Sequence, residues 1–214
     1  MTDIEDMKRA LGVPEIKLLP GPSVRTIARR EGIDLAKLIE ILSWRRPDQS
    51  EEEGEFVELF LDPIEGMMKD TFGNRILVIG ESPTVMWSCH TDTVSNEGGK
   101  QNVKWDGDIL RLNEPKPGQT LGADDGAGLW LMLEMIKAGR PGLYIFHRAE
   151  EVGGLGSKHI SKNSPELLTG IEMAIAFDRK ATHSVITFQR GHRCCADGCG
   201  NALAAKLNQP EGLK

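Results

Sequence analysis

The chain has 214 residues, of which 39% are hydrophobic and 27% are charged, the composition of a globular protein with one sizeable core. Its formal net charge of −6 disfavours nucleic acid as a partner, because binding nucleic acid requires clustered positive charge. No apolar stretch is long enough to span a membrane and no secretory leader is visible, so we expect no membrane partner and a cytoplasmic location with four free cysteines. Nothing in the sequence indicates an oligomeric state.

Residues 1–62 are predicted to be helical and to pack on a catalytic domain formed by residues 63–214. An apolar stripe at helical spacing predicts a first helix that Pro47 ends, and its members are Leu35, Leu38, Ile39 and Leu42. The capping-box pattern at 50–53 predicts a second helix. The apolar residues that this helix is expected to bury are Phe56, Leu59 and Phe60.

From residue 67 the pattern changes to short apolar runs, which predict strands buried on both faces. These runs cover residues 76–79, 85–89, 143–146, 173–177 and 185–188. A hairpin is expected around residues 105–109, and helices are expected at 129–136, from about 157, and at 196–207. The helix at 129–136 is apolar almost all round, which predicts deep burial. The predicted fold class is α/β, a layered sandwich with a central mixed, largely parallel sheet flanked by helices.

Three of the predicted strands stop at residues that bind metals. His90 follows the run 85–89, Glu150 and Glu151 follow the run 143–146, and Asp178 follows the run 173–177. Ligands gather at the carboxyl ends of parallel strands, because the loops there converge on one crevice. Asp124 and Asp125 stand among glycines where a helix begins, so the backbone there can approach an ion closely.

The residue types at these positions suit hydrolysis assisted by a metal ion. Asp92 lies two residues after His90 and can accept a hydrogen bond from its imidazole. Adjacent glutamates project differently, so one of Glu150 and Glu151 can bind a metal while the other acts as a base. Three carboxylates and one histidine form an oxygen-rich set for two divalent ions that share a carboxylate, with zinc, cobalt or manganese as candidates.

Four motifs in order resemble the co-catalytic zinc exopeptidases, a superfamily that includes bacterial two-zinc aminopeptidases and peptidase T. The resemblance covers residues 67–190, and the motifs are SCHTDTV at 88–94, LGADDGAG at 121–128, HRAEEVGG at 147–154 and AFD at 176–178. It implies two zinc ions, a peptide substrate and the hydrolysis of amide bonds by an aminopeptidase type of exopeptidase.

The same resemblance implies a role for each motif residue. His90 and Asp178 would bind separate ions, Asp124 would bridge the two ions, and Glu151 would bind one of them. Glu150 would be the general base and Asp92 would orient His90. The peptide bond between residues 124 and 125 would be cis.

One feature departs from the family pattern. The family has a further histidine ligand late in the domain, and after Asp178 this chain offers only His183 and His192, neither in a matching setting. We therefore expect a C-terminally truncated form of the catalytic domain. Two alternatives stay open: a deacylase or amidohydrolase acting on N-acyl amino acids, and an inactive relic that retains a partial metal site.

Other candidate sites are weaker. Three cysteines with His192 suggest a second zinc site, but reduced core cysteines at a helix start are the preferred interpretation; they are Cys194, Cys195 and Cys199. His147 is either a supporting residue of the site or a buried structural histidine. The glycine-rich segment 153–156 lacks the lysine and spacing of a phosphate-binding loop.

Overall fold

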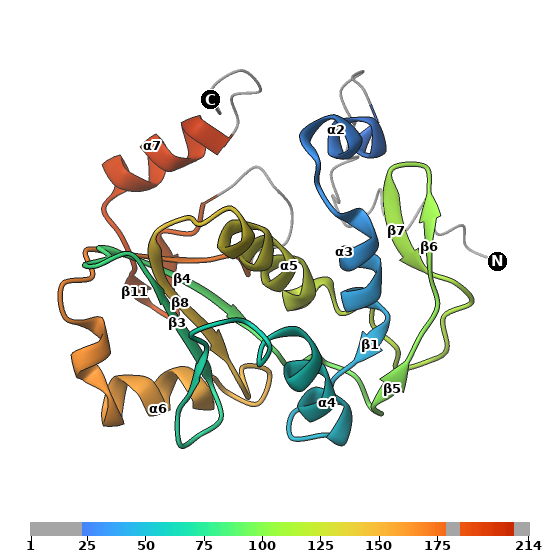
Figure 1. Ribbon diagram of the computed structural model, residues 1–214, viewed down its shortest axis with the longest axis horizontal. Helices are drawn as coiled ribbons and strands as arrows, with labels where there is room; N and C mark the ends of the chain where they lie inside the picture. Colours follow the sequence, from blue (N-terminus) through green and yellow to red (C-terminus); the bar gives the residue numbers. More distant parts are fainter. Residues whose placement is uncertain (1–22, 179–184, 208–214) are drawn as a thin grey trace. The chain divides into compact units, whose positions relative to one another are not determined.

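The computed structural model describes residues 23–178 and 185–207 (Figure 1). The chain divides into two compact units, residues 1–35 and 36–214. The first unit contains helix α2 (Val24–Glu31), which Ser23 caps by accepting a hydrogen bond from the amide of Thr26. The second unit contains both the central sheet and the candidate site. The domain boundary expected at residue 62 stays a prediction.

The centre of this unit is a five-stranded mixed sheet, as predicted. Its strands, in spatial order, are β2 (Met68–Lys69), β3 (Arg75–Ile79), β8 (Gly142–His147), β4 (Val85–His90) and β9 (Met173–Ala176). The pairs β2–β3 and β3–β8 are antiparallel, whereas β8–β4 and β4–β9 are parallel. In the parallel half, His90 is in register with His147. The loops that carry the predicted metal ligands therefore leave the sheet at the same edge.

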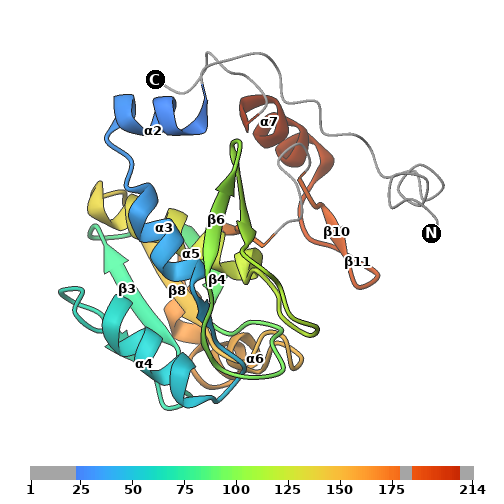
Figure 2. The same ribbon diagram turned by 90° about the vertical axis from the view of Figure 1, so that its right-hand side faces the viewer.

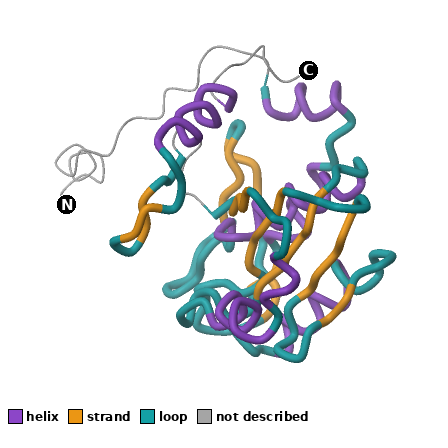
Figure 3. Tube along the Cα trace, turned by 90° about the vertical axis from the view of Figure 1, so that its left-hand side faces the viewer, coloured by secondary structure: helices purple, strands orange, loops and turns teal. Residues whose placement is uncertain are grey.

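Alternate side chains of β8 pack into two apolar clusters on opposite faces of the sheet. Tyr144 and Phe146 join the cluster that contains residues of helices α4 (Glu51–Phe60) and α5 (Ala123–Lys137). Leu143 and Ile145 join the cluster that contains Ile160 of helix α6 (Leu155–Asn163). Helices therefore cover both faces (Figure 3), which confirms the prediction of a layered α/β fold.

The first two predicted helices differ from the structure in detail. Helix α3 (Leu35–Leu42) ends five residues before Pro47, and strand β1 (Trp44–Arg45) follows it and pairs with β5 (Gly99–Lys100). Ile41 is fully buried in α3 although it lies outside the predicted stripe. The residues of that stripe other than Leu42 are only half-buried, namely Leu35, Leu38 and Ile39.

Helix α4 buries a different face from the one predicted. Phe56 and Phe60 are buried as expected, but Leu59 is 53% exposed. Val57 and the charged Glu53 are buried instead, which gives the spacing i, i+3, i+4, i+7 of one helical face. The physical reason is that Glu53 has buried hydrogen-bonding partners in the loops around the site, which turn this face inward.

The later elements agree with the predictions except at two places. The hairpin forms from β6 (Val103–Asp106) and β7 (Ile109–Leu112), separate from the main sheet (Figure 2). Helix α7 (Asp197–Leu207) also forms, and a 3-10 turn (Pro165–Leu168) follows α6.

The prediction of a strand at 185–188 was wrong. Only Phe188 of this segment is in a strand, the two-residue β10 (Phe188–Gln189), which pairs with β11 (His192–Arg193). Helix α5 is not buried all round either, since it packs through one side and leaves Leu131 37% exposed. Within the part of the chain that the structure describes, no helix has the length and apolar character needed to cross a membrane.

Candidate metal centre

His90 is the last residue of β4, and its ring lies buried between two aspartates. Its Nδ1 lies 3.0 Å from the backbone oxygen of Asp92 and 3.3 Å from the carboxylate of the same residue. Its Nε2 lies 2.9 Å from Oδ1 of Asp124. Asp92 is therefore the partner of the Nδ1 atom of the ring. The Nε2 atom faces the carboxylate of Asp124, which is expected to bind the same metal ion as His90.

Asp124 and Asp125 sit at the start of α5 and have different environments. The peptide bond between them is cis, as the resemblance implies. Asp125 is buried, accepting hydrogen bonds from the amides of His90 (3.3 Å) and Gly128 (3.1 Å). A Cβ atom at Gly128 would lie 2.2 Å from Oδ1 of Asp125, so glycine is required at this close approach. Asp125 thus braces β4 against α5, whereas the Asp124 side chain is 67% exposed and faces the site.

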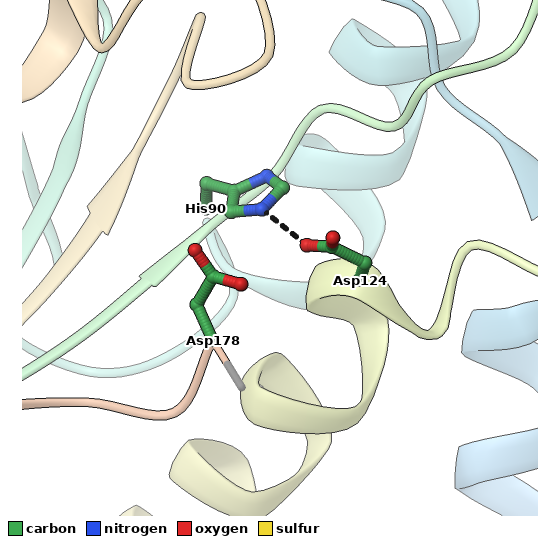
Figure 4. A group of neighbouring side chains, drawn as sticks. All are labelled: His90, Asp124 and Asp178. Carbon is green, nitrogen blue, oxygen red and sulfur yellow. Dashed lines mark hydrogen bonds and ion pairs between the residues drawn. The ribbon is translucent and has the colours of Figure 1, made fainter. Parts of the chain in front are cut away.

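Three predicted ligands come together at this edge of the sheet. One ligand atom from each of His90, Asp124 and Asp178 lies within 4.8 Å of the other two (Figure 4). Asp178 reaches this point because it follows β9, the parallel neighbour of β4. This spacing suits a single ion held by all three residues, which differs from the arrangement in which His90 and Asp178 bind separate ions.

Glu151 lies outside this trio but shares a cavity with Asp124. The cavity has a volume of about 290 Å³ and is lined by Val94, Thr120, Leu121, Gly122, Ala123, Asp124 and Glu151. Burial together with the negative charge of Asp124 raises the pKa of Glu151. The two carboxylates are therefore close enough for their charges to interact across the cavity.

The charges of the site fit a divalent cation. Burial and then the charge of Asp124 raise the pKa of Asp178. Burial lowers the pKa of His90, but the hydrogen bond with Asp92 and the neighbouring carboxylate charges outweigh it and raise the pKa to about 10. For Asp125, burial raises the pKa, and the like charges of Asp178 and Asp124 add to this effect. Together they outweigh the opposing influence of His90 and bring the pKa of Asp125 to about 7. The protein alone thus concentrates negative charge around one imidazole, and imidazole with carboxylates is a donor set for zinc, cobalt or manganese.

Comparison with known proteins decides the family. The model of peptidase family M28 matches residues 75–208, more than half of the chain. The chain belongs to peptidase family M28. This membership confirms the resemblance to the co-catalytic exopeptidases. A comparison with curated protein sequences gave no match.

Three solved structures of peptidases share the fold. A tripeptidase from Staphylococcus aureus subsp. aureus Mu50 is 22% identical with a TM-score of 0.54, and the match covers 69% of this chain and 43% of that one. The aminopeptidase PepT from Bacillus cereus ATCC 10987 is 21% identical with a TM-score of 0.53, and the match covers 72% of this chain and 45% of that one. An aminoacylhistidine dipeptidase from Vibrio alginolyticus is 19% identical with a TM-score of 0.54, and the match covers 71% of this chain and 34% of that one. The matched region spans less than half the length of each of these proteins.

In this M28 domain Asp92 also holds the glutamate loop. Its two carboxylate oxygens accept hydrogen bonds from the amides of Glu150 and Glu151, both at 3.0 Å. Burial raises the pKa of Asp92, but these amides and His90 outweigh it and lower the pKa. Ala149, with a φ of 58°, turns the chain after β8 so that both amides point at Asp92. The sequence predicted only the contact of Asp92 with His90.

The sequence patterns did not indicate two buried ionic residues beside the site. Arg46 and Glu53 are both 0% exposed. The capping-box pattern gave Glu53 a local role only, and nothing in the sequence distinguished Arg46. The one available signal was the position of Glu53, three residues before Phe56 on the apolar face of its helix.

The alternative metal-binding groups are not assembled among the described residues. His192, Cys194 and Cys199 are exposed, and over residues 23–178 and 185–207 the His90 trio is the one group with metal-binding geometry. The four cysteines are free, as expected, but placing Cys194 and Cys199 in the core was wrong. His183 lies outside the described residues. Burial lowers the pKa of His147 to about 4, so this ring is neutral.

Proposed function

We propose that this domain hydrolyses amide bonds of peptides in a metal-dependent reaction, as an exopeptidase of the aminopeptidase type. The observation that carries the proposal is the convergence of His90, Asp124 and Asp178 at one edge of the sheet. Membership of a peptidase family supports a peptide as the substrate. Among the residues that the structure describes, no feature favours an N-acyl amino acid over a peptide.

The predicted ligands would serve two ions. His90, Asp124 and Asp178 would hold the first ion, and Asp124 and Glu151, which line one cavity, would hold the second. Asp124 would then be the carboxylate shared by both ions. When bound, zinc ions supply Lewis acidity and lower the pKa of a water molecule.

The chain's own residues would position the substrate and move the proton. The carboxylate of Glu150 would take a proton from water and deliver it to the nitrogen of the leaving amine. Asp92 would hold this glutamate in place through the backbone amide at 3.0 Å and keep the imidazole of His90 in one orientation. Val94 and Leu121, which line the cavity, would contact an apolar side chain next to the scissile bond.

Metal binding is expected to release protons and to tighten as pH rises from about 6 to about 8. The pKa of His90 is raised to about 10 in the metal-free protein, so its ring is protonated at neutral pH and must lose that proton to bind a metal. Without metal, this raised pKa stabilises the folded state fully below the ordinary histidine pKa, and the stabilisation is lost as pH rises toward about 10.

Calorimetric titration with zinc, in buffers of different ionisation enthalpy, measures the number of protons released. We expect about one proton or more for the ion that His90 binds. No net proton release near neutral pH would contradict the assignment of His90 as a ligand.

The proposed activity is tested with aminoacyl p-nitroanilides, di- and tripeptides, their N-acetylated forms and N-acyl amino acids. We expect zinc-loaded protein to cleave substrates with a free amino group, to lose activity on chelation and to regain it with zinc. Turnover of N-acyl amino acids alone would favour a deacylase. Stable zinc binding without turnover of any substrate would favour an inactive relic.

A cytoplasmic location is also proposed. The four cysteines are free in the structure, as expected in a reducing compartment. Localisation of the tagged protein in fractionated cells tests this directly.

A further inference from the structure

We propose that Glu53 is a positioning residue that fastens together the two loops of the metal centre, the His90–Asp92 loop and the loop 148–151. Glu53 lies on α4, outside the segment 75–208 that matches the family. Its contacts are independent of any metal, and only the interpretation of the loops as a metal centre rests on the proposed function.

Glu53 accepts hydrogen bonds on both carboxylate oxygens in a fully buried position. Its Oε1 accepts from Oγ1 of Thr91 at 2.7 Å and from Nε of Arg148 at 3.1 Å. Its Oε2 accepts from Nη2 of Arg148 at 2.5 Å and from the amide of Gln49 at 3.0 Å. Four donors point at this group, so a neutral amide in its place would set an N–H against another donor whichever way it turned.

The first loop is held from two sides at Thr91, the residue between His90 and Asp92. Its hydroxyl has two acceptors in reach, Oε1 of Glu53 at 2.7 Å and the carbonyl oxygen of His147 at 3.1 Å, and the shorter contact is with Glu53. Its carbonyl accepts from Nε of the buried Arg46 (2.7 Å). The guanidinium of Arg46 lies 4.3 Å from the ring centre of Phe56 and also donates through Nη1 to the carbonyl of Ile41 (3.1 Å), and these contacts help to hold it in place. Displacement of Thr91 would move both neighbours, which are the metal-binding imidazole and its orienting carboxylate.

The second loop is held at Arg148, two residues before Glu150. Its guanidinium donates two hydrogen bonds to the carboxylate of Glu53, and its backbone amide donates to Oδ1 of Asn74 at 3.0 Å. After the turn at Ala149, the backbone amide of Glu150 donates a hydrogen bond to the carboxylate of Asp92.

The contacts therefore form a closed circuit. It runs from Glu53 through Thr91 to Asp92, from there to Glu150, and back along the chain to Arg148 and Glu53. Each loop restrains the other, and Glu53 is the link that comes from outside both of them.

The test is Glu53→Gln, compared with Asp62→Asn. Asp62 also makes a two-bond pair with an arginine, Arg75 (2.5 and 3.0 Å). Arg75 lines a cavity together with Arg148, but the Asp62 carboxylate bonds to Arg75 and not to Thr91 or Arg148. Both variants are expected to lose stability. Only Glu53→Gln is expected to speed hydrogen exchange in peptides that span residues 148–153 of the metal-free protein, and to weaken zinc binding by about 10-fold to 100-fold. Asp62→Asn should leave both quantities within about twofold of the unchanged protein.

Equal exchange and equal zinc affinity in folded Glu53→Gln and unchanged protein would overturn the inference. If Glu53→Gln fails to fold, Thr91→Val removes one of the four hydrogen bonds, together with the longer contact of this hydroxyl with the carbonyl of His147. It should change both quantities in the same direction but less. An unaffected Thr91→Val protein would then overturn it. If the unchanged protein binds no zinc, the proposed function fails, and exchange in the metal-free protein still decides the role of Glu53.

Discussion

Glu150→Gln is expected to lower kcat for peptide hydrolysis by about 10²–10⁴-fold while zinc binding is retained. Glutamine has nearly the same shape but cannot take a proton, so the loss falls on proton transfer. The backbone amide of residue 150 would still donate to Asp92, as it does at 3.0 Å, so the loop keeps its position. Steady-state kinetics together with the zinc content of the purified variant measure the two effects separately.

A matched control for this substitution is Glu166→Gln. Glu166 is exposed in the 3-10 turn after α6, away from the loops of the site, and its replacement should leave kcat unchanged. If Glu150→Gln with full zinc occupancy kept more than about a tenth of the activity, Glu150 would not be the general base.

Asp124→Asn is expected to weaken zinc binding by about 100-fold or more, because the proposal makes Asp124 the carboxylate shared by both ions. The fold should survive, since this side chain is 67% exposed and contacts the buried His90 only through its 2.9 Å bond to Nε2. The charge of Asp124 raises the pKa of both Asp178 and Glu151, so its removal relieves repulsion, but it also removes a partner of the protonated His90 ring. Because these two effects oppose each other, the melting temperature of the metal-free variant should stay close to that of the unchanged protein. Zinc titration and thermal unfolding with and without metal test both expectations.

The exposed glutamate Glu97 provides the control. Glu97→Gln removes one negative charge as well, but outside the trio, and should leave the zinc affinity unchanged. Undiminished zinc affinity in Asp124→Asn would remove the basis for a shared carboxylate.

The convergence of the candidate ligands at the strand ends could be predicted because their positions follow from local pattern. Short apolar runs before His90 and Asp178 predict buried strands, and parallel pairing brings their ends to one edge. The structure shows this pairing for β4 with both β8 and β9. Local pattern does not contain the distance between side chains. For this reason the closeness of His90 and Asp178, which favours their binding one ion together, emerged only from the structure.

The supporting residues were beyond prediction because their partners are distant in sequence. Glu53 contacts a residue 38 positions away and another 95 positions away, so its burial depends on how the sheet folds against α4. The same contacts explain the error at Leu59, since a charged residue with buried partners displaced it from the inward face. The second role of Asp92 likewise depends on a loop nearly sixty positions downstream.

The central claim is that His90, Asp124 and Asp178 hold a metal ion together. Anomalous diffraction at the zinc absorption edge, from crystals of the zinc-loaded protein, tests it most directly. The account predicts an anomalous peak about 2.0–2.2 Å from Nε2 of His90 and from a carboxylate oxygen of each aspartate. An empty position there, with zinc bound instead beside the cysteines at 194–199, would contradict it.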